Sequence, residues 1–266
     1  SHKHYNINLV FAKIQYYIDV NKFFLNKKLH FDSLNSTNET LGQLSKKIEL
    51  QNGFYITTDF QISGKCQNKD KWDSNPKENL LISIFLNLDL NIENSFMLNQ
   101  LASLAVLDTL RKFLEQKIEI KWPNDVFVNN KKISGILINN TVKGGIIKSS
   151  VIGIGINVNQ TNFNEKYVAT SMKLLNKKDF KLNEIEKMLM KNIKKQSMIL
   201  LEKKISLLSI RYNNHLYGKN LDSLFIINKK RIYAKIIEVD QNGKIKLMFG
   251  DSEVNEFSQD EVKLLR

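Results

Sequence analysis

The part of the sequence best suited to chemistry is a lysine followed within four positions by an amide and a carboxylate, in the segment Lys121-Trp122-Pro123-Asn124-Asp125. Proline fixes the local backbone, which favours a turn with polar side chains held beside it. A lysine at the end of a strand next to such a turn is an anion-binding site with its positioning groups attached. A salt bridge with a purely structural role would use the same residue types, so this segment alone leaves both interpretations open.

Two glycines in an apolar run are the second feature, Gly153 and Gly155 within residues 151–159. Glycine weakens a strand and often marks a place where a ligand approaches the backbone closely. The pattern lacks the third glycine and the following helix of a dinucleotide-binding motif, which excludes a Rossmann interpretation. A β-bulge or a packing requirement remains the alternative.

The elements that must position these residues follow from hydrophobic periodicity. Apolar residues three or four apart predict a helix over residues 101–114. Strict alternation over residues 118–122 predicts a half-buried strand, in which Lys121 points to the face opposite Ile120 and Trp122.

Capping patterns and further apolar runs predict the rest of the first domain. Ser36 and its neighbours favour the start of a short helix, and a capping box at residues 183–186 predicts one long helix ending near Tyr212. Additional strands are expected at residues 54–58, 80–86, 126–128, 133–138 and 146–158, with turns at 129–130 and 143–145.

The last 45 or so residues change in character. Short apolar runs lie at residues 225–227, 233–239, 245–249, 254–257 and 262–265, and the turn Asp240-Gln241-Asn242-Gly243 is a hairpin signal. We therefore expect an α+β domain, with a mixed or antiparallel sheet packed against helices, followed by a small β-barrel. The expected boundaries are an extension over residues 1–30, a main domain over 31–215 and a C-terminal domain over 220–266.

Composition restricts the class of protein. The 266-residue chain is 42% hydrophobic and carries a formal charge of +13, but its lysines are spread along the sequence rather than gathered in one basic run. A basic surface that attracts anionic substrates or an acidic protein partner fits this distribution. A single cysteine excludes an internal disulfide, and charges interrupt the apolar N-terminal stretch, so we expect a cytoplasmic protein with no membrane span.

Together, several motifs resemble the catalytic core of the biotin protein ligases, in the order in which that family has them. The motifs are Ser36-Thr37-Asn38, Asp59-Phe60-Gln61-Ile62-Ser63-Gly64-Lys65, Trp72-Asp73-Ser74, Lys121-Trp122-Pro123-Asn124-Asp125, Lys132-Ile133-Ser134-Gly135, Gly153-Ile154-Gly155-Ile156-Asn157 and Ala169-Thr170-Ser171-Met172. The resemblance covers residues 30–265. It implies the fold of that family, related to class II synthetases, with an SH3-like barrel as its C-terminal domain.

The resemblance also implies an activity. The enzyme would use ATP and Mg²⁺ to convert biotin into biotinyl-5'-AMP, and would transfer biotin to a lysine of a biotin carboxyl carrier protein of acetyl-CoA carboxylase or a related carboxylase. Lys121 would be catalytic, because it would bind the biotin carboxylate and then the adenylate phosphate. The residues that would bind biotin are Ser36, Thr37, Asn38, Gln61, Gly64, Lys65, Cys66, Gln67, Trp72, Lys121 and Gly135. Those that would bind ATP are Lys65, Gln67, Asn124, Lys132, Gly153, Gly155 and Asn157, and no metal ligand is identified.

The chain departs from the family in two respects. The family loop reads Gly-Arg-Gly-Arg, whereas here it reads Gly64-Lys65-Cys66-Gln67, so we expect the adenylate to be held less tightly. Only some 30 residues precede the core, too few for the DNA-binding winged helix of some members, so no specific DNA binding is expected. A lipoate or octanoate ligase, a non-catalytic biotin- or adenylate-binding protein, and a DNA-binding regulator argued only from net charge are the alternatives. Oligomeric state stays open.

Overall fold

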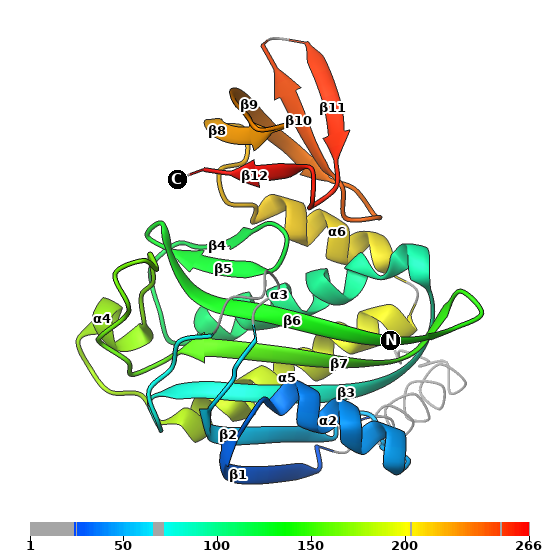
Figure 1. The fold of residues 1–266 in the computed structure, drawn as a ribbon, viewed down its shortest axis with the longest axis vertical. Helices are drawn as coiled ribbons and strands as arrows, with labels where there is room; N and C mark the ends of the chain where they lie inside the picture. The colour runs from blue at the N-terminus through cyan, green and yellow to red at the C-terminus, as the bar shows by residue number, and fades with distance from the viewer. Residues whose placement is uncertain (1–23, 25, 66–71, 203, 251, 266) are drawn as a thin grey trace, which may run out of the picture.

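The computed structural model describes residues 24, 26–65, 72–202, 204–250 and 252–265, and they form two β-sheets with helices packed around the larger one (Figure 1). Cys66, Gln67 and most of the expected extension over residues 1–30 lie outside the described residues.

The larger sheet has seven strands in the order β1-β2-β3-β7-β6-β5-β4. Every neighbouring pair is antiparallel except β1 and β2, which run parallel. The expected mixed sheet is therefore confirmed. Its strands are β1 (Lys28–Leu34), β2 (Tyr55–Gln61), β3 (Asn79–Asn91), β4 (Ile118–Lys121), β5 (Asp125–Val128), β6 (Lys131–Lys143) and β7 (Ile146–Asn157).

Helices cover both faces of this sheet (Figure 1). On one face α3 (Phe96–Leu110) and α5 (Leu182–Leu201) enclose the main core, which includes Ile82 and Ile154. On the other face α2 (Thr37–Lys47) covers a smaller core containing Leu41, Phe85 and Val151. Consecutive strand residues thus serve opposite cores, as the period of two in a strand requires. The 3₁₀ helix η1 (Ile92–Asn94) and α4 (Met172–Asn176) are short connections.

One long helix ending near Tyr212 was the wrong expectation, because two helices occupy this stretch, α5 and α6 (Ile205–Asn214). Helix α5 packs mainly on α3, whereas α6 contacts both α3 and strand β9 of the second sheet. The two helices thus have different partners, and α5 ends at Leu201 before α6 begins at Ile205.

The second sheet is antiparallel, with five strands in the order β11-β10-β9-β8-β12. Among the described residues no pairing joins β11 to β12, so the sheet is open rather than the closed barrel that we expected, although its strand arrangement is consistent with an SH3-like domain. β12 has only three residues, and all of them pair with β8, while β11 is largely exposed. The strands are β8 (Asp222–Ile227), β9 (Lys230–Val239), β10 (Ile245–Phe249), β11 (Glu253–Phe257) and β12 (Val262–Leu264).

The turns expected from sequence are present. Asn129 and Asn130 join β5 to β6 with φ of 49° and 61°, and Gly243 closes the β9–β10 turn with φ of 86°. These left-handed conformations are the ones that asparagine and glycine tolerate best. No helix in the described part of the chain is long and apolar enough to cross a membrane.

Candidate functional site

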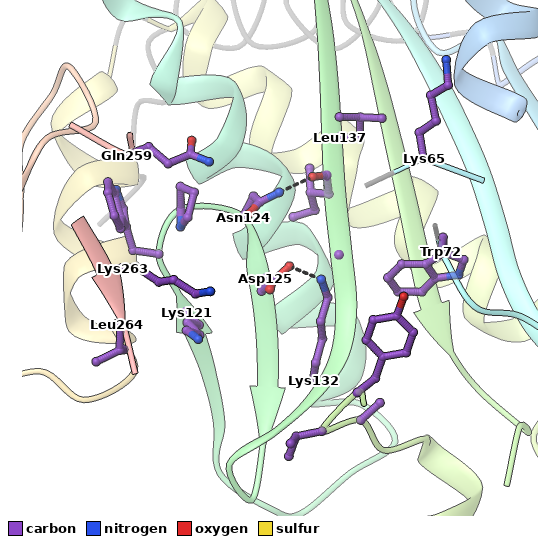
Figure 2. Close-up of a pocket in the computed structure, with 18 of the residues that line it drawn as sticks. Lys65, Trp72, Lys121, Asn124, Asp125, Lys132, Leu137, Gln259, Lys263 and Leu264 are labelled. Carbon is purple, nitrogen blue, oxygen red and sulfur yellow. Dashed lines mark hydrogen bonds and ion pairs between the residues drawn. The ribbon is translucent and has the colours of Figure 1, made fainter. Parts of the chain in front are cut away.

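A cavity of about 1110 Å³ lies between the larger sheet and the second sheet. Its walls come from the N-terminus of α2, the turn after β4, strands β6 and β7, the segment 163–169, and the region of β12. Figure 2 shows Gln259, Lys263 and Leu264 on one side of it and Lys65 and Trp72 on the other, with Lys121, Asn124, Asp125 and Lys132 between them.

Neutral polar side chains gather at the α2 end of the cavity. Ser36 caps the helix by accepting a hydrogen bond from the Glu39 N–H. The Thr37 N–H and hydroxyl both donate to Oε1 of Gln61, at 2.8 and 3.1 Å, and Ser83 Oγ donates to Thr37 Oγ1 at 2.8 Å. These groups are buried and fixed by one another, so they present a preorganised hydrogen-bonding surface.

Asn38 continues this surface across the sheet. Its Nδ2 donates to the Leu137 carbonyl at 3.0 Å, and its Oδ1 accepts from Asn139 at 2.5 Å. A Cβ on Gly153 would lie 2.7 Å from Asn38 Nδ2. The glycine at position 153 therefore makes room for a protein side chain, which is the packing alternative that the sequence left open.

Trp72 lies over the backbone of the sheet. A Cβ on Gly155 would come within 2.6 Å of its indole ring, and one on Gly135 within 2.9 Å. Gly64 supports the same residue, because its carbonyl accepts a hydrogen bond from the Trp72 N–H at 2.9 Å, but Gly64 does not line the cavity. The indole Nε1 is buried without a hydrogen-bond partner among the described residues.

Lysines provide the positive charge of the cavity. The Lys121 ammonium lies 5.2 Å from the centroid of the Phe127 ring, and that of Lys132 lies 5.6 Å from the Trp72 ring. Lys132 also forms an ion pair with Asp125 at 2.6 Å (Figure 2). Lys65, at the cavity edge, pairs with Glu39.

Lys121 and Trp122 both line the cavity, and Trp122 also packs against the main core that contains Ile120. Strand β4 ends at Lys121, and the alternation of a strand does not extend into the turn that follows it. Within the strand the expected pattern holds, since Ile118 and Ile120 are buried and Lys121 is half-buried.

Asn124 and Asn157, both expected on the nucleotide side, differ in their hydrogen bonds to the protein. Asn124 Nδ2 donates to the Ile136 carbonyl at 2.6 Å, so its amide braces the turn against β6. Asn157 donates to the Thr170 carbonyl at 3.0 Å, while its buried Oδ1 has no partner among the described residues. A buried acceptor on a cavity wall with no protein partner is a place where a ligand N–H would be stabilised.

The structure adds two sets of wall residues that the sequence did not identify. Lys132 exchanges backbone hydrogen bonds with Val168 and Thr170, which brings Phe163, Lys166 and Tyr167 to the cavity. The motif Ala169-Thr170-Ser171-Met172 was the signal for this segment. The second sheet contributes Asn228, Lys229, Gln259, Asp260, Glu261 and Lys263, and no local pattern in the sequence marks them.

The carboxylates that line the cavity are Asp73, Asp125, Asp260 and Glu261. In the part of the chain that the structure describes, the one group of three side chains close enough to hold an ion is His30, Asp32 and Asp59, and none of them lines the cavity. The wall therefore suits a Mg²⁺ ion carried largely by the phosphates of a nucleotide, with at most one or two protein carboxylates as ligands.

Comparison with known proteins shows which family this chain is similar to. Residues 30–157 match the sequence model of the biotin/lipoate A/B protein ligase family. The chain contains a domain of that family. The matched residues include the α2 N-terminus, the turn after β4 and both glycines of β7.

Several relatives share this region. The bifunctional ligase/repressor BirA of Bacillus subtilis is 32% identical over 132 residues, which are 50% of this chain and 40% of that protein. BirA of Escherichia coli is 32% identical over 135 residues, 51% of this chain and 41% of that protein. Biotin–protein ligase 1 of Arabidopsis thaliana is 34% identical over 116 residues, 41% of this chain and 31% of that protein. The match spans about two fifths of the length of the bacterial relatives.

The fold also matches a solved structure. Biotin protein ligase from Aquifex aeolicus, in complex with biotin and ATP, superimposes with a TM-score of 0.75 at 24% identity, covering 91% of this chain and 100% of that one. The likeness extends over both sheets, and at this identity it establishes the fold.

Proposed function

We propose that this chain is a biotin protein ligase, which activates biotin with ATP to biotinyl-5'-AMP and transfers biotin to a lysine of a biotin carboxyl carrier protein. The observation that carries the proposal is the division of one cavity into two parts. Buried, neutral hydrogen-bonding groups lie at the α2 end, and lysines lie at the end formed by β4, β5 and β6.

The neutral part suits the ureido ring of biotin. A ureido group has two N–H donors and one carbonyl acceptor, and it is uncharged. Ser36, Thr37, Asn38 and Gln61 offer both hydroxyl and amide groups there, already oriented by hydrogen bonds among themselves. Trp72 and the sheet backbone at Gly135 and Gly155 would enclose the apolar part of biotin.

The cationic part suits a carboxylate meeting a triphosphate. Lys121 and Lys132 would reduce the repulsion between these two anions, with Mg²⁺ on the phosphates supplying further charge neutralisation. Asn157, with its unpartnered Oδ1, would accept a hydrogen bond from the base of the nucleotide. Lys65 stands at the edge of the cavity, where it would act once it left Glu39.

The reaction requires two steps. A carboxylate oxygen of biotin attacks the α-phosphorus of ATP and pyrophosphate leaves, with Lys121 bound to the carboxylate and then to the adenylate phosphate. The ε-amine of the carrier lysine then attacks the acyl carbon, loses a proton, and AMP leaves. Neither step needs a covalent bond to the enzyme, so the chain's own part is to bind, orient and neutralise charge.

The carrier and the cellular location belong to the same proposal. An acidic carrier domain of acetyl-CoA carboxylase or a related carboxylase would be attracted by a chain of net charge +13. A single cysteine, unable to form an internal disulfide, fits a cytoplasmic enzyme. Residues 31–215 would form the catalytic unit and residues 220–266 the smaller one.

The decisive experiment is exchange of labelled pyrophosphate into ATP, with biotin, octanoate or lipoate as the acid. Exchange that depends on biotin, followed by labelling of a carrier domain, is the expected result. Exchange that depends on lipoate or octanoate would assign the chain to the other branch of the family. Binding of biotin without any exchange would leave a binding protein rather than an enzyme.

A further inference from the structure

A buried tyrosine contacts the turn between Lys121 and Asp125. Tyr212 on α6 is fully buried, and its hydroxyl donates to the Pro123 carbonyl at 3.1 Å. Burial, followed by the charge of Asp125, raises the pKa of the Tyr212 phenol well above its usual value, so the hydroxyl stays a donor at neutral pH. Tyr212 itself does not line the cavity.

The same turn is tied to the second sheet. Trp122 Nε1 donates to the Gly243 carbonyl at 2.9 Å, in the turn between β9 and β10. Gly243 has a φ of 86°, and a Cβ at this position would lie 2.5 Å from the Phe96 ring. Phe96 in turn packs edge-on against Tyr212, with ring centroids 5.5 Å apart.

Helix α6 connects these contacts through two adjacent residues. Next to Tyr212, Asn213 accepts a hydrogen bond from the Val239 N–H at 2.7 Å and donates to the Val239 carbonyl at 2.9 Å. Val239 is the last residue of β9, directly before the turn that contains Gly243. One residue of α6 therefore holds the turn after β4, and the next holds the strand whose turn receives Trp122.

We propose that Tyr212 is a positioning residue for the nucleotide end of the cavity, and that the contacts Tyr212–Pro123 and Trp122–Gly243 make the placement of Lys121 and Asp125 depend on the second sheet. The two contacts hold the adjacent residues Pro123 and Trp122, so the loss of either would move Lys121 and Asp125 on the two sides of this pair. Because the ligand concerned is ATP, the inference rests on the proposed function.

The test is Tyr212→Phe, which removes one hydroxyl and keeps the ring that packs on Phe96. Tyr55→Phe is the control, because the Tyr55 hydroxyl also donates one hydrogen bond, to Glu186 at 2.9 Å, and Tyr55 lies outside the cavity. Both variants should lose thermal stability to a similar degree. Only Tyr212→Phe should weaken ATP binding, by about tenfold, with biotin affinity changed less than about twofold.

A second measurement detects a structural change in the turn after β4 and needs no ligand. The chain has two tryptophans, so 5-fluorotryptophan gives two ¹⁹F resonances, which Trp72→Phe assigns. The Trp122 resonance should shift in Tyr212→Phe and stay in place in Tyr55→Phe. A change at Trp122 without a change in ATP affinity, or the reverse, would overturn the proposal. If the parent protein binds no ATP, the proposed function fails by itself, and the Trp122 resonance alone decides the positioning role.

Discussion

The ammonium of Lys132 lies 2.6 Å from a carboxylate oxygen of Asp125, across the pair formed by β5 and β6. Both side chains are about a quarter exposed or less, at 25% and 22%, so solvent screens the pair only in part. A phosphate ligand would attract the Lys132 ammonium and repel the Asp125 carboxylate. Without a ligand these two charges neutralise each other on the cavity wall.

This relationship predicts a non-additive effect of mutation. Lys132→Met should weaken ATP binding more than the loss of one cation requires, because Asp125 is then left as an unpaired negative charge facing the phosphates. The double variant Lys132→Met, Asp125→Asn should recover part of that loss. Calorimetric titration of ATP into the single and double variants measures this. Equal or weaker binding by the double variant would show that Asp125 contributes to ATP binding in its own right.

Replacement of Lys121 is expected to slow adenylation strongly without unfolding the protein. Lys121→Ala should slow biotin-dependent pyrophosphate exchange by about 10²–10³-fold, the typical cost of removing a preorganised charge donor. Its backbone position in β4 accommodates alanine. Lys117→Ala is the control, since Lys117 is 80% exposed and pairs with Glu119 outside the cavity. A Lys121→Ala rate within about tenfold of the parent would remove its catalytic assignment.

Gly155 should not tolerate even one added methyl group. In Gly155→Ala the new Cβ would lie 2.6 Å from the Trp72 ring, so the indole must move, and biotin affinity should fall by about tenfold or more. Gly42→Ala is the matched control. It lies in α2 with nothing within 4 Å of the new Cβ, and it should stabilise the protein by about 0.5–1 kcal/mol. Equilibrium binding of biotin and thermal unfolding measure the two effects; unchanged biotin affinity in Gly155→Ala would exclude Trp72 from the binding surface.

Alkaline pH should destabilise the folded protein through Tyr212. Burial and Asp125 raise its folded-state pKa above the unfolded value of about 10, so its stabilising contribution is complete below pH about 10 and is lost as pH rises toward the folded value. The loss should reach up to about 1.4 kcal/mol per pH unit. Urea unfolding of the parent and of Tyr212→Phe between pH 8 and 11 compares the two slopes. The variant should show the shallower decline, and parallel slopes would mean that the phenol ionises normally.

Local sequence patterns were sufficient to predict much of the fold. Alternation in residues 118–121, the left-handed turn at Asn129 and Asn130, and the hairpin at Gly243 are consequences of backbone geometry that neighbouring residues determine. Ordered motifs also placed Thr37, Gln61, Lys121 and Lys132 in one site, and all four line the cavity.

Contacts between residues far apart in the sequence could be identified only from the tertiary structure. The sequence by itself determined the elements, their turns and the residue types available for chemistry. It did not determine that Gly153 makes room for Asn38, that Asp125 pairs with Lys132, or that Lys263 faces the same cavity as Lys121, because each depends on which surfaces pack together. The open second sheet and the break between α5 and α6 have the same cause. Pairing and packing energies arise only between segments that the fold brings into contact, and no local periodicity encodes them.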